Sequence, residues 1–119
     1  MNLTRYHAAP AYYPPNHEGM HCLRLQGHEA GPSDTLWLGL SHLLPGGGTT
    51  LDASGVEKLY VVLEGEVTIV TEDGGQVREH VLRQYDSARL APGEKRALKN
   101  NTNHPASILL AMPYQSNKL

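Results

Sequence analysis

Residues 17–21, with the sequence HEGMH, contain the H-E-x-x-H pattern by which many zinc enzymes hold their metal ion. The pattern works only on an α-helix, because one helical turn brings both imidazoles to the same face. Gly19 lies inside this segment, and Pro14 and Pro15 stand just before it, so a helix is disfavoured here. The sequence therefore predicts a loop that leads into a strand, and no zinc site.

Two further side chains are of types that suit proton transfer. His42 ends a leucine-rich segment, and it is either a hydrogen-bonded histidine at the rim of the fold or a general acid or base near neutral pH. Tyr60 lies in an apolar run, so it either packs in the core or donates a proton. Residues 46–48 are all glycine but lack the lysine and the following helix of a phosphate-binding loop, which predicts a turn between strands.

Length and composition limit the classes of protein to which this chain can belong. Its 119 residues fit one domain, and 10 Lys and Arg against 12 Asp and Glu give a net charge of -2. Such a chain has no positive field to attract a nucleic acid or an anionic membrane surface, so neither is expected as a partner. The single cysteine, Cys22, cannot form an intramolecular disulfide, and the first residues lack the pattern of a secretory signal. We therefore expect a soluble, cytoplasmic protein without a membrane span.

Apolar and polar residues alternate along much of the chain with the period of two that is typical of β-strands. The chain contains 12 Gly and 8 Pro, spread so widely that an all-helical bundle is excluded. The predicted strands cover residues 20–26, 35–44, 58–63, 66–71, 96–100 and 106–112. We expect residues 45–48 to end the second strand, residues 58–63 to be buried on both faces, and Asp73-Gly74 to form a hairpin turn.

Residues 76–91 are ambiguous by pattern alone. Val77, Val81 and Tyr85 follow helical spacing, whereas the same segment also divides into strands at residues 76–82 and 87–91. Many short strands, with turn signals roughly every eight to twelve residues, predict an all-β, antiparallel sandwich or barrel.

Two segments resemble the motifs of the cupin superfamily. Residues 45–67, PGGGTTLDASGVEKLYVVLEGEV, are similar to the first motif and place Gly65 at its closing glycine. Residues 85–106 are similar to the second motif, and the matching positions are Asp86, Gly93 and Asn100. The resemblance implies an antiparallel double-stranded β-helix, the jelly-roll barrel of small single-domain cupins, with two strands in the ambiguous segment. We expect an extended arm at residues 1–18, the barrel at 19–113 and a polar tail at 114–119.

The positions at which cupins place their metal ligands hold other residues in this chain. Asp52 and Ser54 stand at the two histidine positions of the first motif. Lys58, or Leu59 with the longer spacing, stands at its glutamate position, and Arg96 stands at the histidine position of the second motif. Lysine and arginine repel a divalent cation, which prefers neutral imidazoles and carboxylates. Because these positions are replaced, we expect a cupin-like barrel without a bound metal or another cofactor.

By strand parity, the replaced positions share faces with other polar residues, and in cupins these faces point into the barrel. The implied ligand-binding residues are Asp52, Ser54, Lys58, Tyr60, Arg96 and Asn100. Burial of Lys58 and Arg96 without partners would be costly, so we expect Asp52 to pair with one of them. The remaining positive charge predicts a small anionic organic ligand, gripped by Arg96 through two hydrogen bonds. The alternative is a salt-bridged plug that fills a former metal site.

Three functions stay open on the sequence. The first is metal-free binding of a small anionic organic molecule inside the barrel. The second is a metal-independent isomerase, epimerase or lyase that acts on a small carboxylate or sugar-like substrate, with Lys58 or His42 as base and Tyr60 as acid. The third is a ligand-free, dimeric interaction module. Resemblance to small cupins and the Tyr- and Pro-rich arm at residues 1–18 lead us to expect a homodimer.

Overall fold

Antiparallel strands dominate residues 1–114, which are the residues that the computed structural model describes. The strands are β1 (Ala11–Tyr12), β2 (His17–Gln26), β3 (Leu36–Thr49), β4 (Lys58–Glu64), β5 (Val67–Asp73), β6 (Gln76–Leu82), β7 (Ser87–Leu90), β8 (Lys95–Lys99) and β9 (Ala106–Pro113). The helical elements in this part of the chain are two 3-10 turns, Tyr6–Ala8 and His28–Ala30. The all-β prediction is therefore confirmed, and the ambiguous segment forms the two strands β6 and β7.

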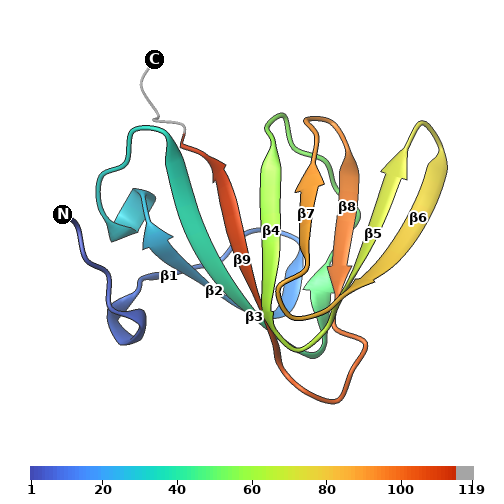
Figure 1. The fold of residues 1–119 in the computed structure, drawn as a ribbon, viewed down its shortest axis with the longest axis horizontal. Helices are drawn as coiled ribbons and strands as arrows, with labels where there is room; N and C mark the ends of the chain where they lie inside the picture. The colour runs from blue at the N-terminus through green and yellow to red at the C-terminus, as the bar shows by residue number, and fades with distance from the viewer. Residues whose placement is uncertain (115–119) are drawn as a thin grey trace.

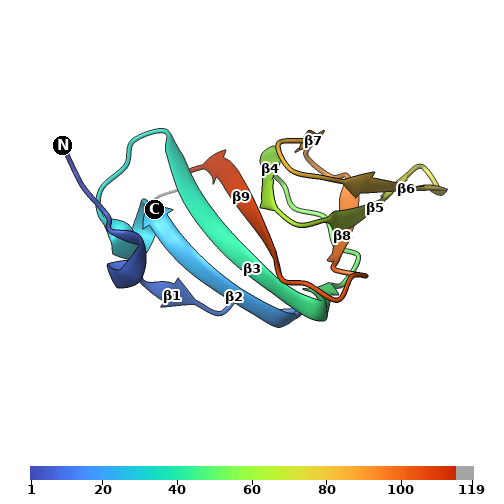
Figure 2. The same ribbon diagram turned by 60° about the horizontal axis from the view of Figure 1, so that its bottom comes forward.

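The strands form a near-closed antiparallel barrel that continues into a larger sheet (Figure 1). The strand order is β6-β5-β8-β3-β9-β4-β7, and β2 pairs with β3 and carries β1 on its other side. Figure 2 shows β1, β2, β3 and β9 extending away from the part of the molecule that holds β4 to β8. Strands β6 and β7 end the order on either side, so the barrel has an open seam between them. No helix in residues 1–114 has the length and apolar character needed to cross a membrane.

Strand β3 is longer than predicted, because residues 45–48 do not end it. The strand continues to Thr49 and stays paired with β2, but beyond Leu43 it leaves β9 and meets β8 by pairing Gly48 with Lys99. A Cβ on Gly47 would lie 2.3 Å from the Gly19 carbonyl oxygen, and one on Gly48 would lie 2.1 Å from the Leu98 carbonyl oxygen. The glycines therefore let β3 pass between two backbones at a corner of the barrel, which is a role of glycine in strands rather than in turns.

Strand β4 corrects a second prediction, since it is buried on one face and not on both. Lys58, Tyr60 and Val62 point inward, whereas Leu59 keeps 44% of its surface exposed. The outer face of β4 has no second layer of structure over it in the described chain, so its apolar side chains meet solvent (Figure 2).

The core lies between the inner faces of the barrel strands. Its buried members are Leu43, Tyr60, Val62, Val67, Ile69, Leu90, Leu98, Ala106 and Ile108. The hairpin predicted at Asp73-Gly74 is present. Strands β5 and β6 pair along their whole length, from Val67 opposite Leu82 to Asp73 opposite Gln76. Within residues 1–18, Ala11 pairs with Leu23 and Tyr12 with Cys22, so this segment adds a short strand to the sheet. The predicted tail at 114–119 lies, except for Tyr114, outside the described residues.

Candidate functional site

Three of the predicted site residues, Lys58, Tyr60 and Arg96, are buried on the inner faces of β4 and β8, with exposed fractions of 8%, 2% and 6%. Arg96 Nε donates a hydrogen bond to the Tyr60 hydroxyl at 2.9 Å, and its Nη1 donates to the Thr49 hydroxyl at 3.2 Å. The Thr49 hydroxyl also accepts the backbone N–H of Leu98 at 3.1 Å. These bonds fix the guanidinium in place and leave its other N–H groups free to bind a ligand.

Asp52 does not form the ion pair that the sequence predicted. Its backbone forms a two-bond antiparallel bridge with Arg96, at 3.0 Å in each direction. Its carboxylate is exposed and accepts hydrogen bonds from the Thr50 hydroxyl and the Asn16 amide. Among residues 1–114, no acidic side chain lies within ion-pair distance of Lys58 or Arg96. The salt-bridged plug is therefore not what fills this part of the barrel, because the Asp52 carboxylate is hydrogen-bonded to Thr50 and Asn16 and not to either cation.

Lys58 has an environment that disfavours its charged form. Burial, and then the positive charge of Arg96, lower the pKa of Lys58 to about 8, while the more distant charge of Asp52 opposes the change. In the part of the chain that the structure describes, no acceptor hydrogen-bonds to the Lys58 amine. A share of this amine is therefore neutral at slightly alkaline pH, where it can act as a base or a nucleophile.

His17 belongs to the surroundings of this cluster, although the sequence analysis assigned it no role. Its Nδ1–H donates to the Pro15 carbonyl at 2.7 Å, which leaves Nε2 as the free ring nitrogen. Burial lowers the pKa of His17, and the charges of Arg96 and Lys58 lower it further. Its pairing with Thr49 across β2 and β3 places it there, and the sequence gives no local signal of that pairing.

Both histidines of the H-E-x-x-H pattern lie in β2, although the sequence predicted a strand only at His21 and a loop at His17. The surroundings of the two histidines differ. A register shift between Glu18 and Met20 separates them. His21 pairs with His42 of β3, and their rings stack with centroids 6.4 Å apart. In residues 1–114, no three His, Cys, Asp or Glu side chains are grouped so that they could hold a metal ion.

His42 lies apart from the Lys58 and Arg96 cluster and is held by hydrogen bonds. Its Nδ1 is 2.8 Å from the Ser107 hydroxyl, and its Nε2 is 2.8 Å from the Tyr6 hydroxyl. Burial, followed by the charge of His21, lowers the pKa of His42. Of the two interpretations left open by the sequence, the geometry matches the hydrogen-bonded histidine.

The side chains of Asn100 and Ser54 form hydrogen bonds within the protein. The Asn100 amide donates to the carbonyls of Leu43 at 2.9 Å and His104 at 2.7 Å. Its side-chain oxygen accepts the backbone N–H and the hydroxyl of Thr102. The Ser54 hydroxyl donates to the Val56 carbonyl at 3.0 Å. Asn100 therefore uses its whole hydrogen-bonding capacity to hold the fold and has none left for a ligand.

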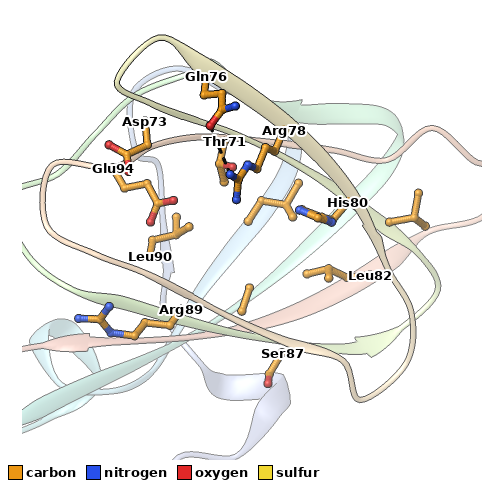
Figure 3. Close-up of a pocket in the computed structure, with 13 residues that line it drawn as sticks. Thr71, Asp73, Gln76, Arg78, His80, Leu82, Ser87, Arg89, Leu90 and Glu94 are labelled. Carbon is orange, nitrogen blue, oxygen red and sulfur yellow. Dashed lines mark hydrogen bonds between the residues drawn. The ribbon is translucent and has the colours of Figure 1, made fainter.

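A cavity of about 520 Å³ opens at the seam between β6 and β7 (Figure 3). It is lined by Ile69, Thr71, Asp73, Gln76, Arg78, His80, Val81, Leu82, Ser87, Ala88, Arg89, Leu90 and Glu94. None of the six predicted ligand-binding residues is among these. The cavity borders their cluster, however, because Thr71 pairs with Arg96 across β5 and β8, and Leu90 pairs with Lys58 across β7 and β4.

Polar side chains give this cavity both signs of charge. Figure 3 shows Asp73 and Glu94 at one end of the cavity, with Arg78 and His80 along its β6 side. Glu94 is oriented by a hydrogen bond of 3.1 Å from the backbone N–H of Ala91. The alternation of β6 places Gln76, Arg78 and His80 on one face, and that pattern could have identified the cavity lining before the structure was known.

Comparisons with known proteins identify one curated relative and many similar structures. No family model matches the chain. It is 42% identical over 114 residues to a Mycobacterium tuberculosis protein named Beta-D-galactosidase Rv1717, and the match covers 96% of this chain and 95% of that protein.

The solved structures that resemble this chain have low sequence identity to it. The polyketide cyclase RemF from Streptomyces resistomycificus has a TM-score of 0.81 at 19% identity, covering 99% of this chain and 82% of that one. A sugar phosphate isomerase of the cupin superfamily from Silicibacter pomeroyi has a TM-score of 0.75 at 23% identity, covering 93% and 74%. A cupin-2 domain from Rhodospirillum rubrum has a TM-score of 0.76 at 16% identity, covering 97% and 76%. The chain belongs to the same family as this Mycobacterium tuberculosis protein, and its fold is that of the small barrels of the cupin superfamily.

Proposed function

We propose that this cupin binds a small, anionic, sugar-like molecule inside its barrel, with the anionic group at Lys58 and Arg96 and the rest of the ligand in the adjoining cavity. The observation that carries the proposal is the pair of buried cations with no acidic partner within ion-pair distance in residues 1–114. A buried charge without a partner costs several kcal/mol, and an anionic ligand would offset that cost.

The positively charged donor set also argues against a cation in this place. Lys58 and Arg96 stand where cupins hold metal ligands, and an ammonium and a guanidinium repel a metal ion instead of coordinating it. Arg96 keeps free N–H groups beyond its bonds to Tyr60 and Thr49, so it can still grip a carboxylate or a phosphate.

The cavity supports a sugar-like body for the ligand. Its volume of about 520 Å³ lies within the range of small-molecule sites, and Gln76, Arg78 and His80 offer the mixed donors and acceptors that hydroxyl groups require. The relative at 42% identity is named a galactosidase, and one structural neighbour is named a sugar phosphate isomerase. A sugar that carries a phosphate or carboxylate would use both the cavity and the cations.

Galactose 6-phosphate should raise the melting temperature of the protein by about 10 °C at a concentration near one hundred times its dissociation constant. Inorganic phosphate should give a smaller shift, because it uses the cations alone. Differential scanning fluorimetry measures both. Lys58→Met should lose the shift, whereas the matched control Lys95→Met, at an exposed position on β8, should keep it. An equal shift in both variants, or none in the unchanged protein, would contradict the proposal.

Hydrolysis of a β-D-galactoside is a second candidate function, favoured by the name of the 42% relative. Glycoside hydrolysis commonly uses two carboxylates on either side of the scissile bond, and Asp73 and Glu94 both line the cavity. If the protein cleaves nitrophenyl β-D-galactoside, Glu94→Gln and Asp73→Asn should each lower kcat by about 100-fold or more. Glu79→Gln, on the exposed side of β6, is the control. Activity that persists in both cavity variants would rule out these two residues as the catalytic pair.

The other two functions left open by the sequence receive less support. An isomerase that uses His42 as its base is disfavoured, because His42 is held by Ser107 and Tyr6 away from Lys58 and Arg96. Lys58 remains available as a base, and Tyr60 as an acid would have to break its bond with Arg96. An interaction module with a filled interior does not explain the open cavity lined by Thr71 and Leu90, the residues that pair with Arg96 and Lys58.

We also expect the protein to be a homodimer that associates through the outer face of β3, β9 and β4. Apolar side chains line up across these three strands: Leu36, Leu38 and Leu40, then Leu109 and Ala111, then Leu59 and Val61. A second copy would cover this face with an identical one. Light scattering at micromolar concentration should give twice the monomer mass, and Leu59→Lys should reduce it to that of the monomer. Val77→Lys, at an exposed apolar position on β6, should leave the dimer intact, and a monomeric unchanged protein would refute the expectation.

A further inference from the structure

The side chain of Lys58 is buried but keeps some contact with solvent. The residue keeps 8% of its surface exposed at the start of β4. Within residues 1–114, every side-chain nitrogen or oxygen that is closed off from solvent has a hydrogen-bond partner. The Lys58 amine has no such partner there, so it keeps contact with solvent.

The neighbours of Lys58 favour the neutral, nucleophilic form of its amine. Arg96 cannot swing away, because Tyr60 and Thr49 hold its guanidinium on two sides. Burial and this fixed cation lower the pKa of Lys58 to about 8, whereas the exposed carboxylate of Asp52 compensates only in part. A desolvated lysine beside a second cation is the arrangement that activates amines for covalent chemistry with carbonyl compounds.

We propose that Lys58 forms an imine with an aldehyde or ketone that carries a carboxylate or phosphate, while Arg96 binds the anionic group. The amine nitrogen attacks the carbonyl carbon, a carbon–nitrogen bond forms, and the carbonyl oxygen leaves as water. Both hydrogens of the neutral amine end on that oxygen, so the step needs no oxidant, reductant or further reactant. The inference rests on the proposed binding of an anionic, sugar-like molecule, since the open-chain form of a sugar phosphate is such a carbonyl compound.

Glyoxylate is the probe for this site, since it joins an aldehyde to a carboxylate. The full-length protein is incubated with glyoxylate and sodium cyanoborohydride, which reduces an imine to a stable amine, and the product is analysed by intact mass and peptide mapping. We expect one carboxymethyl group on Lys58, formed at least about tenfold faster than on the exposed Lys95 and Lys99. Propanal, which lacks the anionic group, should lose most of this preference. Equal labelling of the three lysines would overturn the proposal.

Lys58→Arg separates the imine from the binding site on which it depends. This variant keeps a cation at the position, so galactose 6-phosphate should still stabilise it, but it cannot form the adduct. If the unchanged protein is stabilised by galactose 6-phosphate and yet gives no adduct on Lys58, the imine proposal fails and the binding proposal stands. If neither stabilisation nor adduct is seen, both fail. Lys95→Met is the control and should be labelled at Lys58 like the unchanged protein.

Discussion

Replacing Asn100 by Ala should lower the free energy of unfolding by about 3 to 5 kcal/mol. The side chain is fully buried and joins the carbonyls of Leu43 and His104 to the turn at Thr102. Alanine would remove four hydrogen bonds at once, of which only the one to the His104 carbonyl has a substitute donor, the Thr102 hydroxyl. Each buried group left unsatisfied costs about 1 to 3 kcal/mol. These bonds join β3 to the loop between β8 and β9. Without them the barrel loses a link between segments that are distant in the sequence.

Urea denaturation followed by circular dichroism measures this effect. Asn103→Ala is the matched control, because Asn103 lies in the same connection, is exposed, and should change the free energy of unfolding by less than about 0.5 kcal/mol. If Asn100→Ala cost no more than this control, the hydrogen-bond network around Asn100 would not hold the fold as we describe.

Lys58→Met should raise the free energy of unfolding at pH 7 by about 1 to 3 kcal/mol in the absence of ligand. The pKa of Lys58 is about 8 in the folded protein, below its ordinary value of 10.5, so folding disfavours the protonated amine. Below pH 8 the folded protein therefore bears the full cost of burying this charge. Between pH 8 and 10.5 the unfolded chain binds more protons than the folded one, and stability rises with pH in that window.

The test compares the two proteins in urea at pH 7 and at pH 9.5. The advantage of Lys58→Met should be largest at pH 7 and should shrink at pH 9.5, because the amine of the unchanged protein is then mostly neutral. Lys95→Met, at an exposed position, should show no such trend. A difference that stays constant with pH would mean that Lys58 affects stability through packing and not through its charge.

The two predictions describe opposite uses of a buried polar side chain. Asn100 has every hydrogen bond satisfied within the chain, so its removal destabilises the barrel. Lys58 has no partner in residues 1–114, so its charge destabilises the ligand-free barrel and is available to an anion. The proposed binding function predicts that an anion which neutralises this charge stabilises the barrel.

The sequence by itself determined the class of fold and the strands that build it. The alternation at residues 20–26 and 106–112, and the hairpin signal at Asp73-Gly74, follow from local rules, because side-chain direction in a strand repeats every two residues. The resemblance to cupin motifs resolved the ambiguous segment, which local pattern alone could not do. Strand parity put Lys58 and Tyr60 on one face, and the resemblance to cupins implied that this face and that of Arg96 point into the barrel, where the structure has all three buried.

The tertiary structure alone decided which partner each polar side chain has. Asn100 was predicted to face a ligand, but its donors reach Leu43 and His104, and Asp52 was predicted to pair with a buried cation, but its carboxylate is exposed. Strand parity predicts on which face of a strand a side chain lies. Its hydrogen-bond partner depends on which segment, distant in the sequence, packs against that face. Gly47 and Gly48 carry β3 through a corner instead of ending it, because two other backbones come too close there for a residue with a Cβ. No local pattern in the sequence shows that close approach.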